Sequence, residues 1–169
     1  MKNLVHLYWG DGKGKTTAAM GLALRALGHG GQVTVLQFLK DGHSGEIALL
    51  QKLGARVYAG KPEPGFTWQL TGAEKRQVLE QQNQLLGRAL REDCSLLVLD
   101  EACAALESGL VDEELLKTAV LQRPAGREVV LTGRSPAAWM FEAADYVTEM
   151  RCGKHPFERG IPAWEGVEY

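Results

Sequence analysis

The sequence predicts an α/β fold in which a mainly parallel β-sheet is covered by helices on both faces. Short apolar runs, typical of buried strands, alternate along the chain with longer segments of helical pattern. A glycine-rich turn stands between the first apolar run and the first helical segment. The run at 96–99 contains only leucine and valine, which indicates a central strand that is buried on both faces.

Each expected element follows from a local signal. The first helix ends at the glycine-rich segment 28–31, Ser44 is placed to cap the second, and Thr71 with Glu74 forms a capping box that opens the third. Beyond residue 150 the prolines Pro156 and Pro162 predict an irregular tail. The expected strands are 4–8, 32–39, 56–59, 95–100, 128–132 and 146–150, and the expected helices are 15–27, 44–53, 71–91, 111–121 and 136–144.

Composition restricts the classes of protein that fit. A chain of 169 residues predicts one domain over 1–169, to which the tail 151–169 belongs. The net charge of -2 and the sequence pI of about 6.1 argue against a nucleic-acid partner. The first eight residues are too short for a secretory signal, and no apolar run is long enough to span a membrane. The odd number of widely spaced cysteines predicts reduced thiols and a cytoplasmic protein.

The glycine-rich turn at 10–17 is a phosphate-binding loop that is one residue shorter than usual. The common pattern places a glycine five residues before the final glycine of the loop, but here Gly10 precedes Gly14 by only four. Backbone N–H groups of such a loop bind phosphate, Lys15 adds positive charge and Thr16 offers a hydroxyl to Mg²⁺. The loop follows a strand and precedes a helix, and strands alternate with helices along the chain. This order predicts a P-loop NTPase-like (RecA-like) sheet. The predicted nucleotide-binding residues are Gly10, Asp11, Gly12, Lys13, Gly14, Lys15, Thr16 and Thr17.

Two carboxylates follow the most apolar strand, at Asp100 and Glu101. Acids at this position are the usual Mg²⁺ partners of a phosphate loop, because both lie at the carboxyl edge of a parallel sheet. The alternative is that Asp100 caps a helix and Glu101 is solvated. Arg134, which follows the strand at 128–132, is expected at the same edge, where a guanidinium binds phosphate in a bidentate way; a plain surface arginine is the alternative.

Aromatic residues in a proline-bounded loop and a histidine in the tail are further candidates. Phe66 and Trp68 are suited to forming an apolar wall for a large flat ligand, although the residues alone favour ordinary packing. His155 is able to ligate a metal or shuttle a proton, but a structural role in the tail fits better. The sequence leaves the roles of Asp145 and Lys154 open.

The sequence resembles the ATP:corrinoid adenosyltransferases, also called cob(I)alamin adenosyltransferases, of the cobalamin-pathway type. The similarity spans nearly the whole chain, and the shortened loop together with the tail makes it specific. The segments that carry it are 10–19, 25–30, 35–40, 65–68, 98–101, 131–134, 144–150, 154–157, Gly160 and 166–169.

The resemblance implies that the protein transfers the 5′-deoxyadenosyl group of ATP to Co(I) of a reduced corrinoid and releases triphosphate. Attack is at C5′, and the family holds ATP reversed relative to ordinary phosphate-loop proteins, which is consistent with a reshaped loop. Lys15, Lys13 and Arg134 would stabilise the leaving triphosphate, while Thr16 and Glu101 would hold Mg²⁺ or Mn²⁺.

By the same resemblance, Phe66 and Trp68 would fill the space beneath the corrin ring. Removing the lower axial ligand from Co(II) takes away electron donation and makes reduction to Co(I) easier. A flavoprotein electron donor and a homodimer are also implied. The sequence does not indicate which corrinoid is preferred.

The chain departs from the family pattern at three places. It begins almost at the first strand, whereas some members have an N-terminal extension that helps to cover the nucleotide. Asp11 stands where asparagine is common, and Ala102–Cys103 replaces a frequent Leu-Thr pair. Two other functions stay open: a small-molecule kinase or ATPase, for which Asp100 is the strong candidate base, and a nucleotide-gated corrinoid carrier without turnover.

Overall fold

The computed structural model describes residues 3–60 and 70–167, and its centre is a six-stranded parallel sheet. The strand order is β3-β2-β4-β5-β1-β6. Each strand end lies within one residue of its predicted position, and the predicted parallel sheet is confirmed. The strands are β1 (Val5–Trp9), β2 (Val33–Phe38), β3 (Arg56–Gly60), β4 (Leu96–Asp100), β5 (Glu128–Gly133) and β6 (Tyr146–Glu149).

The predicted helices form, and two short elements were not predicted. The helix expected from residue 111 starts later, because the Asp112 side chain accepts a hydrogen bond from the N–H of Leu115 and caps it. The unpredicted elements are one α-helix of six residues and one 3-10 helix of four residues. The helices are α1 (Lys15–Gly28), α2 (Gly45–Lys52), α3 (Gly72–Arg91), α4 (Ala102–Glu107), α5 (Glu113–Leu121), α6 (Ala138–Ala143) and the 3-10 helix η2 (Pro156–Arg159).

The caps proposed from the sequence have different outcomes. The capping box of α3 is present, since Glu74 N–H donates to the Thr71 hydroxyl and the Glu74 carboxylate accepts from Thr71 N–H. Ser44 does occupy the N-cap position of α2, but its side chain makes no capping hydrogen bond.

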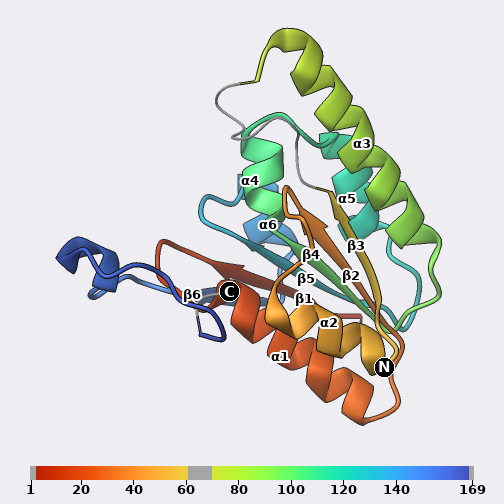
Figure 1. Cartoon of the computed structure of the whole chain (residues 1–169). Helices are drawn as coiled ribbons and strands as arrows, with labels where there is room; N and C mark the ends of the chain where they lie inside the picture. The colour runs from red at the N-terminus through yellow and green to blue at the C-terminus, as the bar shows by residue number, and fades with distance from the viewer. Residues whose placement is uncertain (1–2, 61–69, 168–169) are drawn as a thin grey trace.

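Helices cover both faces of the sheet and divide the core into two layers (Figure 1). Helices α1 and α2 lie against one face, and α3, α4, α5 and α6 lie against the other. Strand β4 supplies side chains to both layers: Leu97 and Leu99 pack on the α3 side, and Leu96 and Val98 pack on the α1 side. All five of its residues are buried, which confirms the prediction of a central strand.

Helix α4 lies close against β5 through a contact between Cys103 and Gly133. A Cβ atom built on Gly133 would be only 2.3 Å from the Cβ of Cys103. The Cys103 thiol is buried and lies 3.7 Å from the sulfur of Met140. Burial, together with the nearby charge of Glu101, raises the pKa of Cys103 from 9.0 to about 12.

This thiol predicts a loss of stability at alkaline pH. Between pH 9.0 and about 12 the unfolded chain has lost the Cys103 proton while the folded chain keeps it, so the free energy of unfolding falls as the pH rises. The variant Cys103→Ala keeps the Cβ beneath Gly133 and should show a shallower decline, measured by urea unfolding across this window. Equal slopes for the two proteins would contradict the prediction.

The tail beyond β6 loops away from the sheet and returns toward the start of α1 (Figure 1). Its return is marked by a hydrogen bond from the Lys13 ammonium to the carbonyl of Val167, 3.0 Å long. The tail contains η2, where the irregular structure predicted from its prolines is interrupted by one turn. Among the described residues, no helix has the length and apolar character needed to cross a bilayer.

Candidate active site

The phosphate loop connects β1 to α1 at the carboxyl edge of the sheet. Gly10 and Gly14 adopt φ angles of 111° and 112°, which a residue with a side chain rarely adopts. Gly12, between them, does not have a positive φ. Helix α1 therefore begins directly after a glycine whose backbone turns the chain, so that its first residues, Lys15 and Thr16, stand next to the loop.

The backbone just after β6 hydrogen-bonds to this loop and packs closely against it. Gly12 N–H donates to the carbonyl of Met150 over 2.7 Å, and Met150 N–H donates to the carbonyl of Trp9 over 2.7 Å. A Cβ on Gly10 would lie 2.4 Å from the Met150 carbonyl oxygen, and one on Gly12 would lie 2.7 Å from the Arg151 backbone. The Gly12 N–H is thus bonded to Met150 in this structure, and nucleotide binding by Gly12 stays a prediction. These glycines are required for close packing against β6.

The two loop residues beside Gly12 also contact the tail. The Asp11 carboxylate accepts a hydrogen bond from the N–H of Cys152 over 3.0 Å, which gives the acidic residue at this position a structural role. The Lys13 ammonium donates to Val167, as described above. The shortened loop is thus held by residues that lie 141 and 154 positions later in the chain.

Lys15 lies under the loop with its ammonium directed back to it. The ammonium donates to the carbonyl of Gly12 over 2.6 Å. Partial burial lowers the pKa of Lys15; the positive charge of Arg134 acts in the same direction, and the negative charge of Glu101 opposes it. The charges of Glu101 and Arg134 are therefore close enough to Lys15 to affect its pKa.

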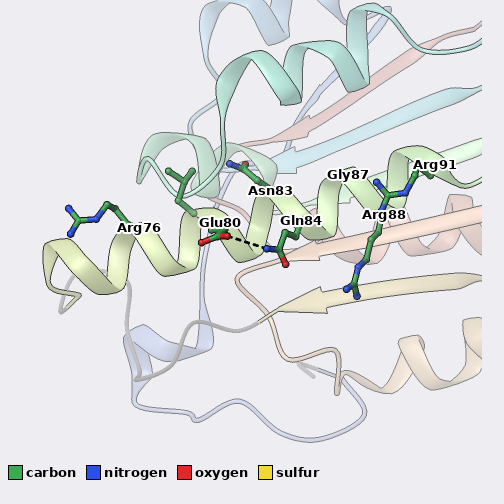
Figure 2. A pocket seen from close by; sticks show the side chains of 8 residues that line it. Arg76, Glu80, Asn83, Gln84, Gly87, Arg88 and Arg91 are labelled. Carbon is green, nitrogen blue, oxygen red and sulfur yellow. Dashed lines mark hydrogen bonds between the residues drawn. The ribbon is translucent and has the colours of Figure 1, made fainter.

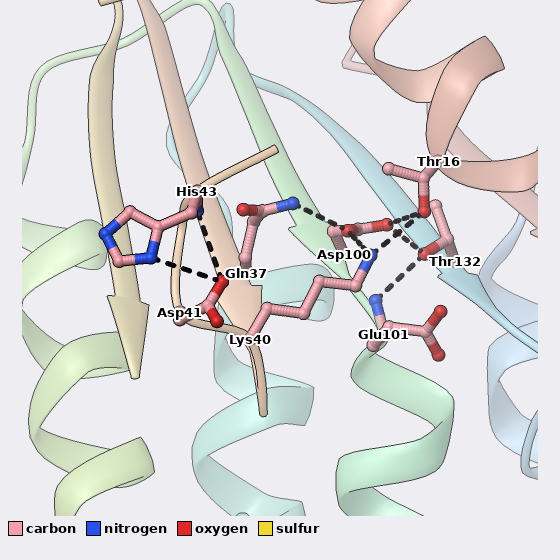
Figure 3. A network of polar contacts seen from close by, with 8 residues as sticks. All are labelled: Thr16, Gln37, Lys40, Asp41, His43, Asp100, Glu101 and Thr132. Carbon is pink, nitrogen blue, oxygen red and sulfur yellow. Dashed lines mark hydrogen bonds and ion pairs between the residues drawn. The ribbon is translucent and has the colours of Figure 1, made fainter. Parts of the chain in front are cut away.

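Asp100 is the centre of a hydrogen-bond network that joins four elements (Figure 3). The hydroxyls of Thr16 and Thr132 donate to one of its oxygens over 2.8 and 2.7 Å. The Gln37 amide donates to the other oxygen over 3.1 Å, and the Lys40 ammonium lies 2.7 Å from the same oxygen. Asp100 itself is completely buried, so every strong interaction of this carboxylate is made within the protein.

The structure bears on the alternative interpretation of the acids, in which Asp100 caps a helix. Asp100 does not cap a helix: the N-cap of α4 is Glu101, whose side chain makes no capping hydrogen bond. Glu101 has a left-handed backbone with φ 61°, and its N–H donates to the Thr132 hydroxyl over 2.9 Å. Such a conformation costs about 1–2 kcal/mol in a non-glycine residue and is common at functional sites. It turns the Glu101 carboxylate away from Asp100 (Figure 3).

The sequence analysis missed three members of this network: Gln37, Lys40 and Thr132. A signal existed for Gln37, because it is the only amide in a strand whose other residues, apart from Thr34, are apolar. Lys40 was named only within the segment 35–40 that resembles the family. No pattern in the sequence indicates that its side chain bends back toward β4. In the segment 132–134, Arg134 was chosen as the candidate residue and Thr132 was not. Arg134 lies exposed after β5.

A cavity of about 1050 Å³ opens beside the loop. Its walls include Thr16 and Thr17 of α1, the segment 39–46 that leads into α2, and the returning tail at Gly166 and Val167. Its volume is at the upper end of the range of small-molecule sites. A second hollow of about 760 Å³ lies along α3 between Arg76 and Arg91 (Figure 2) and shares no residue with the loop or the network.

Comparison with known proteins identifies the family. A sequence model described as "ATP:corrinoid adenosyltransferase BtuR/CobO/CobP" matches residues 1–169. The chain belongs to this family. A corrinoid adenosyltransferase from Pseudomonas aeruginosa is 40% identical over 98% of this chain and 82% of the relative. Relatives of the same description from Escherichia coli and Salmonella typhimurium are each 33% identical over 99% of this chain and 86% of the relative.

In this adenosyltransferase the remaining candidate residues have different outcomes. Phe66 and Trp68 lie outside the described residues. Asp145 is structural, because its carboxylate and its N–H bond the backbone of Val5 at the start of β1. His155 caps η2 by accepting a hydrogen bond from the N–H of Phe157, in agreement with the expected structural role. Lys154 is exposed in the tail.

The oxygen donors at the site fit a hard divalent metal. The Thr16 hydroxyl bonds to Asp100, and Glu101 follows Asp100 at the end of β4 with its carboxylate turned away from Asp100. In the described part of the chain, no three His, Cys, Asp or Glu side chains form a cluster that would enclose a metal by themselves. Mg²⁺ suits such an open set, since it takes one or two carboxylates and completes its shell with phosphates and water.

Proposed function

We propose that this adenosyltransferase moves the 5′-deoxyadenosyl group from ATP to Co(I) of a reduced corrinoid. The cobalt electron pair forms a bond to C5′, the bond from C5′ to oxygen breaks, and triphosphate leaves with that oxygen. No general base is needed, because the nucleophile carries no proton. The observation that carries this function is the family match over the whole chain, which includes the shortened phosphate loop.

The protein's own contribution is electrostatic. The leaving triphosphate gains negative charge in the transition state, and positive groups already in place stabilise it without reorganisation. Lys15 under the loop, Lys13 within it and Arg134 after β5 are the residues that we assign to this role. The lowered pKa of Lys15 comes mainly from partial burial, and an ammonium with little solvent around it interacts more strongly with phosphate.

We propose Thr16 and Glu101 as the protein ligands of the metal. Mg²⁺ or Mn²⁺ supplies positive charge that neutralises the triphosphate when it is bound. Asp100 supports this site by accepting a hydrogen bond from the Thr16 hydroxyl, which fixes the direction of the oxygen that would face the metal. The test is metal dependence of triphosphate release, with Glu101→Gln compared to the unaltered protein.

A kinase or ATPase mechanism is less well supported by the geometry. Such an enzyme needs a carboxylate that accepts a proton or positions water near the γ-phosphate. Asp100 was the candidate for that role, but it is buried and already has two hydroxyl, one amide and one ammonium donor. Both oxygens of this carboxylate are thus already occupied by donors of the protein, which fits a structural anchor better than a group that positions water or accepts a substrate proton.

The function is tested by an anaerobic assay. Purified protein is mixed with MgATP and chemically reduced cob(I)alamin, the visible spectrum is followed, and phosphate products are measured. We expect light-sensitive adenosylcobalamin and an equal amount of triphosphate. ADP or free phosphate without a cobalt–carbon bond would instead favour a kinase or ATPase. A changed corrinoid spectrum without product would favour a carrier.

Further features rest on the family resemblance. We propose that Phe66 and Trp68 displace the lower axial ligand of the corrinoid, that a flavoprotein supplies the electron, and that the enzyme works as a homodimer in the cytoplasm. Replacing Trp68 by Ala should impair adenosylation that starts from Co(II) more than adenosylation of chemically prepared Co(I). Equal losses in the two assays would contradict the assigned role.

A further inference from the structure

The Lys40 ammonium lies where a metal ion would be expected. It is 2.7 Å from an Asp100 oxygen and 3.2 Å from the hydroxyl oxygen of Thr16 (Figure 3). In a phosphate-loop site these are the two groups whose oxygens hold or support Mg²⁺. The Lys40 ammonium, a monovalent cation, therefore lies between Asp100 and the Thr16 hydroxyl.

The charge of Asp100 accounts for this arrangement. A buried, ionised carboxylate is strongly unfavourable without a positive partner, and Lys40 is the only cationic side chain that the described residues place in direct contact with it. Lysine forms the pair as a compact point charge on a flexible stem, so the same side chain is also able to withdraw. It is one third exposed, which leaves it a path to solvent.

The backbone just before Lys40 has an unusual conformation that directs the Lys40 side chain toward β4. Leu39 has a left-handed backbone with φ 58°, directly after β2 ends. This turn directs the chain across the carboxyl edge and brings Lys40 back toward β4. Leu39 and Glu101 are the non-glycine residues with positive φ in the described chain, and they follow neighbouring strands on either side of the site. Local strain of this kind is typical of functional sites.

We propose that Lys40 is an internal cation that occupies the metal site until the nucleotide arrives. A divalent ion bound to Thr16 and an ammonium bound to the same oxygen would repel each other strongly at this distance. Metal loading therefore requires Lys40 to leave Asp100. Free metal alone binds weakly, because it must displace a cation that is already paired, whereas metal that arrives with ATP also brings a new anionic partner for Lys40.

The cavity beside the loop is the place to which Lys40 moves. Lys40 lines this cavity together with Thr16 and Thr17, where a polyphosphate held by the loop would lie. On loading, the ammonium exchanges the Asp100 carboxylate for phosphate oxygens, and Lys40 becomes a positioning residue for the nucleotide. The inference rests on the proposed function in taking a metal–ATP complex as the ligand.

The first test measures Mn²⁺ binding by electron paramagnetic resonance in the absence of nucleotide and corrinoid. The variant Lys40→Met removes the competing charge and should bind Mn²⁺ about tenfold more tightly or better than the unaltered protein. Lys40→Arg keeps the charge and should bind no more tightly than the unaltered protein. Lys52→Met, an exposed lysine at the end of α2, is the matched control and should change nothing. Equal Mn²⁺ affinity in Lys40→Met and the unaltered protein would overturn the proposal.

A second test uses the unaltered protein, so it does not depend on the variant folding. Lysines are labelled briefly with an amine-reactive reagent with and without saturating Mg²⁺, at matched ionic strength, and labelling at each site is read by mass spectrometry. Labelling at Lys40 should rise when the metal is bound, while labelling at Lys52 should stay constant. Unchanged labelling at Lys40 under saturating metal would also reject the proposal. Neither test involves adenosyl transfer, so a negative result here leaves the activity itself unaffected, and a failed activity assay leaves these results standing.

Discussion

Replacing Lys15 by Ala should reduce adenosyl transfer by at least about 10²-fold, the usual effect of removing one preorganised charge from a developing anion. The Lys15 ammonium already lies against the loop, 2.6 Å from the carbonyl of Gly12, so no other positive group takes its place without moving. The loss should be mainly in kcat, because the charge on triphosphate grows as the bond to C5′ breaks. Anaerobic kinetics with prepared cob(I)alamin measure the effect.

Corrinoid binding separates this role from a loss of folding. Lys15→Ala should keep the spectral change that accompanies corrinoid binding, because Lys15 acts on phosphate. Lys52→Ala is the control for lost charge and should retain full activity. If Lys15→Ala retained the activity of the unaltered enzyme, the assignment of this loop to the leaving triphosphate would be wrong.

Replacing Gly10 by Ala should destabilise the protein by about 3 kcal/mol or more and prevent nucleotide binding. Two costs add: a positive φ of 111° at a residue with a side chain, and a Cβ 2.4 Å from the Met150 carbonyl oxygen. The carbonyl is backbone at the end of β6, so it is unable to move aside like a flexible side chain. Urea unfolding measures the stability, and a fluorescent ATP analogue measures binding.

Two neighbouring glycines provide matched controls, because each shares only one of these costs. Gly14 has a φ of 112°, but the nearest atom to a Cβ there is the Met150 sulfur at 3.5 Å. Gly12 lacks the positive φ, but its Cβ would be 2.7 Å from the Arg151 backbone. We expect Gly10→Ala to cost the most stability and both other variants to cost less. If Gly10→Ala and Gly14→Ala were equally stable, packing of β6 against the loop would not determine the loop's shape.

The fold was predictable because its signals are local. Apolar runs such as 96–99 define the strands, and a capping box at Thr71 defines the start of the longest helix. The loop was predictable for the same reason, since its glycines, Lys15 and Thr16 are adjacent in sequence. Helix α4 was missed because only Glu101 separates it from β4, so no turn or proline marks its start.

The Asp100 network was predictable only in part, because its members come from four separate elements. Their sequence separations from Asp100 range from 32 residues for Thr132 to 84 for Thr16. The ion pair with Lys40 depends on the left-handed backbone of Leu39, and leucine gives no signal of such a conformation. The contact of Gly12 with Met150 likewise depends on the position of β6 beside β1, which the strand pattern alone does not fix.

The place of β1 in the sheet has a consequence for how the protein is made. Its two neighbours are β5 and β6, which are synthesised more than 120 residues after it. During translation, β1 therefore has no partner at either edge until β5 and β6 have been synthesised. By then most of the chain has left the ribosome. Contacts of such long range form slowly and expose apolar strand edges to aggregation. Nucleotide is thus able to stabilise only a nearly complete chain.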